Sequence, residues 1–595
     1  MNAPVEETSP ALRRILQEDA IGQLRRRDGE MAHLGSEDGA LKLDWVEGVD
    51  RLLQDSQLLE QVESEAISLW NTGIRHIIWS GMGGSVITVR VLADMGFCDG
   101  YNGTHIAIYP LDSTDPAALN SIVRQIANAK KMEIPQTIDH TFLSTLLQDV
   151  MMIGVSMGMT SEEPMTHLEW FTACLEQAHL PLDTHLMVMT LPGSYLDKFA
   201  QQHSIPSRPL QPDGGTGTGG RMSAPATRVF LLPAAIYLTR AFQAPGHLRT
   251  VLAQSWQQYN LDLATQNPAQ HPFVQLAARL SDSSVEGSSR LLLDFSDEWQ
   301  ALPQWIEQLM EESLGKGGKG IVVFNQQSLN THAPTYHNNG LLSVHVIAHE
   351  EQHSFSYTVV QPYMNSSNGQ ERLAAVATQF LNWQLCMALY GYLQDIQFAG
   401  QPAVENYKAR ARALRTASDP LVITSQWPDV VKQDGLTLLT PSGTTLYETA
   451  AETFTHALQA IIKALGTLDY LDITFNGLIS HDVSSLMHIY QRDTGNVNLG
   501  LPVKVRRAPA AYHSTEQSEM DGPARLVSLR LLAAQHEPSL LGDYTDMFLR
   551  AQAISTWQAM LDVHRACFLL VYDNEEQLHH FFDGVTNRSG ILERE

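Results

Sequence analysis

Residues Trp305–Gly320 read W-I-E-Q-L-M-E-E-S-L-G-K-G-G-K-G, and the fold of the whole chain can be worked out from this stretch. A helix is predicted because its apolar residues fall on one stripe at helical spacing, namely Trp305, Ile306, Leu309 and Met310. The glycine-rich run that follows predicts that the helix ends near Gly315. The apolar residues 321–324 then predict a buried strand. Helix, tight turn and strand in this order are typical of an α/β protein.

Two polar residues of this helix form a candidate catalytic pair. Gln308 and Glu312 are four positions apart, so they project from the same face. An amide beside a carboxylate at a helix end could hold and deprotonate a polyol. The alternative is an exposed acidic helix end, since Glu307 and Glu311 lie beside Glu312. Spacing alone favours this alternative, so the decision depends on other motifs.

The composition limits the function classes. The chain has 595 residues, of which 44% are hydrophobic and 17% charged, and this length predicts about two to four globular domains. Its 65 acidic and 39 basic residues give a formal charge of -26, which argues against a nucleic-acid or anionic-membrane partner. An anionic small substrate stays compatible with this charge if the site itself is locally positive, through Arg, Lys and helix N-termini.

The location of the protein is predicted from cysteines and apolar runs. The four cysteines, Cys98, Cys174, Cys386 and Cys567, lie far apart, which indicates buried free thiols in a reducing compartment. No signal peptide is expected, because the first 24 residues lack an apolar core. No run of about 18 apolar residues predicts a membrane span. A cytoplasmic protein is expected.

Alternating strands and helices predict parallel sheets with right-handed crossovers. Residues 1–55 are expected to form a helical arm, followed by domains at 56–250 and 251–430 and an α/β section at 431–595. Strands are expected at Arg75–Ser80, Ile106–Pro110, Asp149–Val155, Leu186–Leu191, Arg290–Phe295, Ile321–Phe324, Leu342–Ile347, Ser354–Val360, Leu468–Phe475, Val503–Arg507 and Cys567–Val571. The first two domains share this layout without a clean sequence repeat. The polar end, Gln577–Glu595, is expected to fray.

Two strand-to-helix turns are candidate anion sites. The first, S-G-M-G-G-S at Ser80–Ser85, has glycines that allow bare N–H groups to cradle an anion. It matches neither a dinucleotide fingerprint nor a Walker A loop, and a purely structural turn is the alternative. The second, V-S-M-G-M-T-S-E-E at Val155–Glu163, carries the hydroxyls of Ser156, Thr160 and Ser161. These could cap the next helix or bind an oxyanion.

Two further segments carry candidate groups. The run D-G-G-T-G-T-G-G at Asp213–Gly220 is either a flexible linker or an active-site loop that ends on Arg221. In Phe398–Lys408, Pro402 predicts a helix start, with Gln401 before it and Lys408 almost two turns later; a solvated helix face is the alternative for Lys408.

Residues His349–His353 match H-E-x-x-H, the zinc motif of metalloproteases. They lie in a loop between predicted strands. Two imidazoles share a metal-binding face at this spacing only on a helix. No metal site is therefore expected.

Together these motifs resemble the phosphoglucose isomerase family, which has two SIS (sugar isomerase) domains. The resemblance covers about residues 70–415, and more loosely the section beyond, and is strongest to the isomerase part of bifunctional transaldolase/phosphoglucose isomerases. No transaldolase barrel is expected, because the stretch before the first predicted strand is too short for one. That branch has W-L-E-Q-L-I-A-E-S-T-G-K-x-G-K-G, similar to Trp305–Gly320. Its G-I-G-G-S, G-G-R-Y-S and F-D-Q-P-x-V-x-x-x-K segments look like Gly81–Ser85, Gly219–Ser223 and Phe398–Lys408. Its H-S-T-G-Q-L-H-K-G-G-P segment looks like His513–Pro523.

The resemblance implies a fold and a set of roles. The fold is two SIS-type doubly wound, mainly parallel sheets in three αβα layers, plus a C-terminal α/β section. Glu312 would be the catalytic acid–base, Arg221 would stabilise an oxyanion, and Lys408 would assist ring opening. The substrate-binding residues would be Gly83, Gly84, Ser85, Ser156, Thr160, Ser161, Gln308 and Gln401. No metal or organic cofactor is implied; the family is usually dimeric, so a homodimer is possible.

This sequence departs from the family pattern at two places. The family's phosphate loop reads S-K-[ST]-x-T-T, whereas this chain has Met157 and Gly158 in place of the lysine and the middle hydroxyl. This loop is therefore expected to bind phosphate less strongly than the family's loop. The ring-opening histidine has no assigned position, and the second histidine of the H-S-T-G-Q-L-H segment falls on Glu519.

The resemblance implies reversible isomerisation of glucose 6-phosphate and fructose 6-phosphate through a cis-enediol(ate), with Glu312 as base and then acid. A small-molecule sugar phosphate is thus the expected partner. One alternative is a sugar-phosphate-binding sensor without turnover, which the altered loop favours and the retained Glu312 and Arg221 oppose. Another is an isomerase of a different phosphosugar, such as mannose 6-phosphate.

Overall fold

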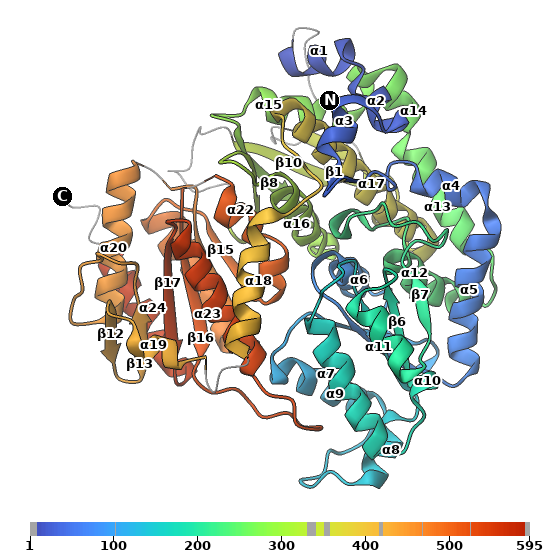
Figure 1. Ribbon diagram of the computed structural model, residues 1–595. Coiled ribbons are helices and arrows are strands. Elements are labelled where there is room, and N and C mark those ends of the chain that lie inside the picture. The colour runs from blue at the N-terminus through green and yellow to red at the C-terminus, as the bar shows by residue number, and fades with distance from the viewer. Residues whose placement is uncertain are drawn as a thin grey trace.

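The computed structural model describes residues 9–100, 103–329, 341–349, 357–415, 420–466, 468–523 and 525–589. Figure 1 shows three sheet-containing parts, with the C-terminal part (orange and red) beside the first two (blue to yellow). The N-terminal residues form short helices and one hairpin that lie against the first two parts: α1 (Pro10–Gln17), α2 (Ala20–Arg26), α3 (Gly29–Leu34), β1 (Ser36–Glu37), β2 (Ala40–Leu41) and α4 (Gly48–Gln54).

The first sheet has five parallel strands: β3 (His76–Ser80), β4 (Ala107–Leu111), β5 (Val150–Val155), β6 (Leu186–Thr190) and β7 (Ser207–Pro209). Their spatial order is β4-β3-β5-β6-β7. This is the order of a doubly wound sheet, in which the chain reverses direction across the sheet between β3 and β5. Loops at the carboxyl ends of these two strands therefore border a natural ligand crevice.

Alternate side chains of β3 face the two helical layers of this part. Ile77 and Trp79 belong to the core shared with α5 (Ser56–Asn71), α6 (Ile87–Asp94) and α12 (Arg228–Ala241). Ile78 faces the opposite layer, made by α7 (Pro116–Ala129), α8 (His140–Leu147), α9 (Glu163–Gln177) and α11 (Tyr195–His203). The predicted three-layer arrangement is confirmed, because successive side chains of a strand point to opposite faces.

The second sheet has four parallel strands: β8 (Ser288–Asp294), β9 (Gly320–Asn325), β10 (Leu341–Ile347) and β11 (Tyr357–Val360). Their order, β11-β10-β8-β9, repeats that of the first four strands of the first sheet. The shared layout predicted from sequence is therefore confirmed. Residues 354–356 of the last predicted strand lie outside the described residues.

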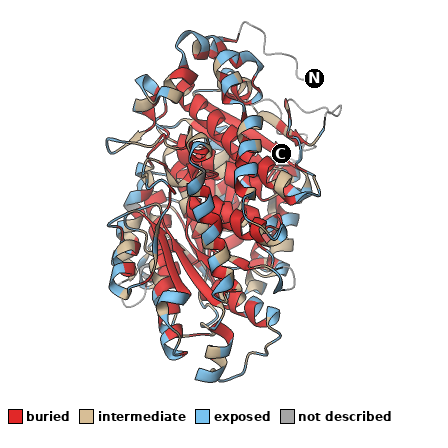
Figure 2. Ribbon diagram, turned by 90° about the vertical axis from the view of Figure 1, so that its right-hand side faces the viewer, coloured by how far each residue is buried: buried red, intermediate tan, exposed pale blue. Residues whose placement is uncertain are grey.

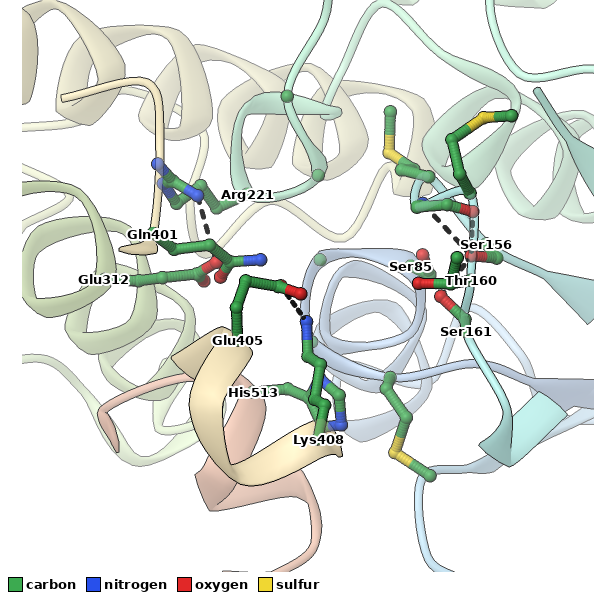
Figure 3. A pocket seen from close by; sticks show the side chains of 18 of the residues that line it. Ser85, Ser156, Thr160, Ser161, Arg221, Glu312, Gln401, Glu405, Lys408 and His513 are labelled. Atoms are coloured by element: carbon green, nitrogen blue, oxygen red, sulfur yellow. Dashed lines mark hydrogen bonds and ion pairs between the residues drawn. The ribbon is translucent and has the colours of Figure 1, made fainter. Parts of the chain in front are cut away.

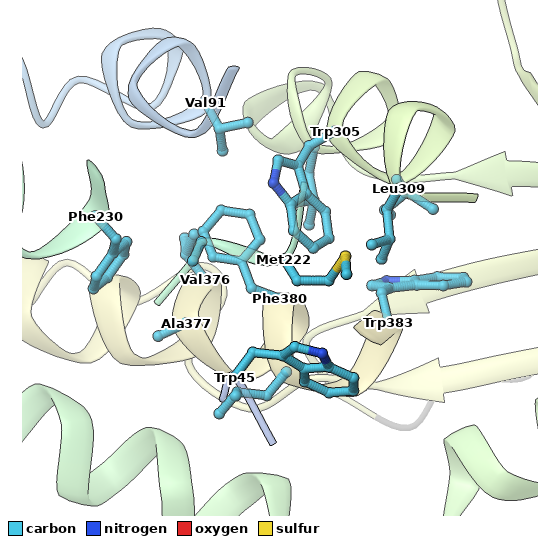
Figure 4. Packing of buried hydrophobic residues seen from close by; sticks show 14 of the residues in the cluster. Trp45, Val91, Met222, Phe230, Trp305, Leu309, Val376, Ala377, Phe380 and Trp383 are labelled. Carbon is cyan, nitrogen blue, oxygen red and sulfur yellow. The ribbon is translucent and has the colours of Figure 1, made fainter. Parts of the chain in front are cut away.

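The helix predicted at Trp305 is α16 (Leu302–Leu314), and Gly315 follows its last residue, as expected. It crosses from β8 to β9 and packs on α17 (Gly369–Gln394), which is buried along most of its length. In Figure 4 the ring of Trp305 lies beside Phe380, with centroids 4.5 Å apart, and Trp383, Met222 and Trp45 belong to the same cluster. This aromatic packing fixes the helix that carries Gln308 and Glu312.

The third sheet has six strands: β12 (Val430–Gln433), β13 (Leu436–Leu439), β14 (Tyr470–Asn476), β15 (Val503–Ala508), β16 (Leu526–Ala533) and β17 (Ala566–Tyr572). The order β15-β14-β16-β17 is parallel and again follows the doubly wound pattern, and the hairpin β12–β13 adds antiparallel strands beside β17. The C-terminal α/β section is thus a third unit of the same strand order.

The expectation of a fraying C-terminus is wrong as far as residue 589. Residues Glu575–Ser589 form α24, whose Leu578, Phe581, Phe582 and Val585 are buried. Their spacing of three, four and seven positions gives the helix one apolar face, which packs on α20 (Ala450–Leu465).

Figure 2 shows how burial is distributed over the molecule. The strands and the inner faces of the helices are buried, and the outer faces of the helices are exposed. Within the described ranges, no helix is both long and apolar enough to cross a membrane.

Candidate active site

A cavity of about 460 Å³ lies where the carboxyl ends of β3 and β5 meet α16, and it contains every site residue predicted from the sequence. Its lining includes Gly83, Gly84, Ser85, Ser156, Thr160, Ser161, Arg221, Gln308, Glu312, Gln401 and Lys408. Figure 3 shows the hydroxyl-bearing loop on one side and Arg221 with Glu312 on the other, with Lys408 and His513 between them. Segments more than 300 residues apart in sequence therefore share one cavity.

The carboxylate of Glu312 is held from two directions. Arg221 Nη1 lies 3.0 Å from its Oε1, and the amide of Gln308 donates to its Oε2 at 2.9 Å. Glu312 is only 5% exposed and Gln308 only 2%. The alternative of an exposed acidic helix end is therefore wrong. The neighbouring Glu311 is also buried, and its charge is met by Lys504.

Gln308 connects the helix to the third part of the protein. Its Nε2 also donates to the main-chain carbonyl of His513 at 3.0 Å. Its Oε1 is buried and has no hydrogen-bond partner among the described residues. Buried polar atoms are normally paired, so a free acceptor in the lining of a cavity is available to a ligand hydroxyl.

Arg221 is anchored by main chain as well as by Glu312. It lies in the 3-10 turn Gly220–Met222, and its Nε donates to Ser313 Oγ at 2.7 Å. Its Nη2 donates to the carbonyls of Phe398 (2.8 Å), Gly400 (3.1 Å) and Ala399. Since a guanidinium has a fixed fork of N–H groups, these contacts leave one N–H of Nη1 for a ligand and set the position of Glu312.

The glycine-rich segment is an ordered loop, so the flexible-linker interpretation is wrong. Asp44 accepts from the N–H of Gly217 at 3.0 Å, and Thr218 forms a β-bridge with Leu43. A Cβ on Gly84 would lie 2.1 Å from the carbonyl oxygen of Gly220. Only glycine permits this close approach of the two loops, which brings Ser85 and Arg221 to the same cavity.

Two hydroxyls of the second turn, those of Ser156 and Ser161, bind each other, and no side chain caps the helix. Ser156 Oγ lies 2.5 Å from Ser161 Oγ and accepts from the N–H of Gly158 at 3.1 Å. The residue that precedes α9 is Glu162, and its side chain makes no capping bond. The helix-capping alternative for these hydroxyls is therefore wrong.

Helix α18 (Pro402–Arg415) brings Lys408 over the cavity. Pro402 begins the helix, as the sequence predicted, and Gln401 lines the cavity just before it. Lys408 Nζ contacts Glu405 Oε1 at 2.6 Å, and both residues line the cavity. Lys408 is thus partly exposed on a helix face that borders the cavity.

His513 and Glu163 are site residues that the sequence reasoning did not assign. His513 Nε2 lies 2.7 Å from Glu163 Oε1, and Gln552 donates to the same oxygen at 2.8 Å. Burial opposes ionisation of Glu163, but the charge and hydrogen bond of His513 outweigh it and lower its pKa to about 2. His513 opens the segment that resembles H-S-T-G-Q-L-H, which was the available signal.

Two other expectations concern residues away from this pocket. Glu519, at the position of the family's second histidine, is buried beside Arg506 and Arg530 and is absent from the cavity lining. Of the H-E-x-x-H segment, only His349 is described, and residues 350–353 lie outside the described residues. No cluster of metal-ligating side chains occurs in the described part of the chain.

No family model matches the chain. A curated glucose-6-phosphate isomerase from Rippkaea orientalis is 27% identical over 268 residues, which are 42% of this chain and 44% of that protein. The match thus spans less than half of the relative.

Two solved structures align over more of the chain. A hypothetical protein from Thermus thermophilus aligns with a TM-score of 0.49 and 21% identity over 68% of this chain and 97% of that one. A glucose-6-phosphate isomerase from Chlamydia trachomatis aligns with a TM-score of 0.47 and 13% identity over 70% and 86%. From its sequence likeness and its two doubly wound parallel sheets, the chain is a distant homologue of glucose-6-phosphate isomerase with the SIS-type fold.

Proposed function

We propose that this protein is an aldose–ketose isomerase that interconverts glucose 6-phosphate and fructose 6-phosphate. The observation that carries the proposal is the buried carboxylate of Glu312, which Arg221 and Gln308 hold in the cavity. The same cavity is lined by the loop that carries Ser156, Thr160 and Ser161, here called the hydroxyl loop. The homologue from Rippkaea orientalis bears the name of this activity. A fixed carboxylate is the group that proton transfer between two adjacent carbons requires.

The proposed chemistry uses one carboxylate in two steps. Glu312 removes the proton from C2 of the open-chain aldose, and the C1 carbonyl becomes part of a cis-enediolate. The protonated Glu312 then returns the proton to C1, while the proton of the C2 hydroxyl passes to the C1 oxygen, so that C2 becomes the ketone and C1 carries the hydroxyl. The remaining N–H of Arg221 Nη1 and the free Oε1 of Gln308 would bind the oxygens on which charge and protons change.

Ring opening is assigned to the His513–Glu163 pair, with Lys408 beside it. An imidazole oriented by a carboxylate can give a proton to the ring oxygen and take one from the hydroxyl of the anomeric carbon. Glu163 fixes the ring through Nε2, so Nδ1 is the atom that would exchange protons. Lys408 and Gln401 would hold sugar hydroxyls, and Gly83, Gly84, Ser85, Ser156, Thr160 and Ser161 would bind the phosphate end.

The test is conversion of fructose 6-phosphate, with the glucose 6-phosphate formed measured by a coupled dehydrogenase. Incubation in D₂O adds a direct test of the base, because proton transfer through Glu312 places deuterium at C1 or C2. A wild-type protein that binds sugar phosphate without conversion or exchange would establish a sensor. Conversion of mannose 6-phosphate alone would instead establish a different phosphosugar isomerase.

A further inference from the structure

The hydroxyl loop lacks a positive charge of its own. Residues 155–163 contain no lysine or arginine, and they end in Glu162 and Glu163. Both carboxylates lie at the start of α9, where they already occupy the favourable field of the helix N-terminus. A phosphate dianion at Ser156 and Ser161 would thus face two negative charges. Its binding requires a cation from another segment.

Helix α18 supplies a cation at this place. Arg412 lines the cavity, and its Nε lies 2.8 Å from Oε1 of Glu162, the residue after Ser161. Arg412 follows Lys408 by four positions, so both project from the same face of the helix toward the cavity. The Arg412 side chain is 40% exposed, so its guanidinium can reach a ligand that enters from solvent.

The charge balance around Glu162 leaves one positive charge unmatched. Arg415 Nη1 lies 3.7 Å from the other oxygen of Glu162, so two guanidiniums share one carboxylate. Arg415 is also held over the ring of Phe548, with 4.7 Å between its guanidinium carbon and the ring centroid. Arg415 can therefore continue to neutralise Glu162 while Arg412 turns to an anion. Arginine suits this role because its fork matches two phosphate oxygens.

We propose that Arg412 binds the phosphate group of the substrate and replaces the lysine that the hydroxyl loop lacks. Glu162 is the positioning residue that holds Arg412 beside Ser156 and Ser161. The inference deepens the proposed function and rests on it for the identity of the ligand as a sugar phosphate. It places the phosphate subsite between two elements, the loop after β5 and helix α18, which are 250 residues apart at the Glu162–Arg412 contact.

The test measures binding, so that it does not depend on turnover. Calorimetric titration with fructose 6-phosphate, and separately with inorganic phosphate, is carried out on the wild-type protein, Arg412→Ala and Arg412→Lys. Arg412→Ala is expected to weaken both by about tenfold or more, because a charge-assisted contact is lost. Arg412→Lys is expected to recover part of this loss. Phosphate-free fructose should bind all three proteins alike.

Arg410→Ala is the matched control, since Arg410 lies on the same helix and pairs with Asp562. It should leave both affinities unchanged. Glu162→Gln keeps an oxygen that can hold Arg412 in place but removes a negative charge beside the phosphate. It should therefore tighten phosphate binding, and weaker binding would show that the Glu162–Arg412 contact is purely structural.

Unchanged affinity in Arg412→Ala would overturn the proposal. Lys42 is another cation of the cavity lining, so a loss of affinity in Lys42→Ala in place of Arg412→Ala would overturn it as well. Failure of the wild-type protein to bind either probe would also overturn it. Binding that depends on Arg412 without isomerisation would leave the Arg412 assignment intact and refute the proposed function alone.

Discussion

Nη1 of Arg221 lies 3.0 Å from Oε1 of Glu312, and each residue is only 5% exposed. This ion pair joins the turn after the glycine-rich loop to the end of α16. A buried charge that loses its partner destabilises a protein strongly. A substitution of either residue should therefore keep a group that can hydrogen-bond to the other.

Glu312→Gln is expected to fold and to lose isomerisation. The amide can still accept a hydrogen bond from Arg221 but cannot take a proton from C2, and loss of a general base lowers kcat by about 10²–10⁴-fold. The coupled assay gives kcat, and deuterium exchange should disappear with it. Circular dichroism and binding of fructose 6-phosphate serve as controls for folding. Wild-type turnover in this variant would show that another group is the base.

Arg221→Lys is expected to lower kcat by about 10²–10³-fold with a small change in KM. Lysine keeps the charge but loses the fork that contacts Ser313, Glu312 and the carbonyls of Phe398 and Gly400 at once. The carboxylate of Glu312 would then be less well oriented in the transition state. Steady-state kinetics separates the two constants. A rise in KM alone would indicate that Arg221 only holds the ligand.

The double variant Met157→Lys, Gly158→Thr restores the loop pattern of the family. It tests whether a further positive charge at the phosphate subsite raises the affinity for the substrate. An additional charge-assisted contact is expected to tighten substrate binding by about 1–3 kcal/mol. A Cβ at residue 158 would lie 3.1 Å from Ser161 Oγ, so that side chain must shift by a few tenths of an ångström. Met157→Lys alone is the control for this crowding.

If Arg412 already binds the phosphate, the gain from Met157→Lys should be larger in the Arg412→Ala background than in the wild-type protein. Equal gains in both backgrounds would show that the two cations act independently. KM and the dissociation constant of fructose 6-phosphate are measured for all four combinations.

Glu163 is expected to make the stability of the protein depend on pH below about 5. Its pKa is about 2 in the folded protein against 4.5 as the ordinary value, so the folded state binds fewer protons. Its contribution, about 3 kcal/mol, is complete above pH 4.5 and is lost as pH falls toward 2. Glu163→Gln should therefore be less stable than wild type at pH 7, with a difference that shrinks on acidification.

Urea unfolding at several pH values measures this difference. The exposed Glu169 on the same helix gives a matched control, because Glu169→Gln removes a carboxylate without a buried partner. A difference between wild type and Glu163→Gln that stays constant from pH 7 to pH 3 would contradict the assignment of a low pKa to Glu163.

The sequence predicted those parts of the site that local patterns encode. Gly81–Ser85 and Ser156–Ser161 each follow an apolar strand, so their position at one edge of a parallel sheet follows from topology. The assignment of Glu312 rests on the resemblance of Trp305–Gly320 to the family's catalytic segment, because its spacing alone favours an exposed helix end. The burial of Glu312 was not predictable, since it depends on Arg221, which is 91 residues away.

Strand β16 and the role of His513 were not predicted, because both depend on contacts with residues that are not their neighbours in sequence. Strand β16 was missed because Arg530 interrupts its apolar residues, and only the structure shows that Glu516 neutralises this arginine. His513 was not assigned because its role depends on contact with Glu163, 350 residues earlier in the chain. Patterns of neighbouring residues do not contain such contacts.

The wide spread of the cavity lining, from Glu37 to Gln552, has a consequence for synthesis of the protein. A nascent chain of 500 residues already contains both parallel sheets, Arg221 and Glu312, but it lacks His513 and the helix that carries Gln552. Domains fold largely in order as they leave the ribosome. The cavity lining therefore becomes complete only after residue 552 has been synthesised, when the third sheet docks against the first two.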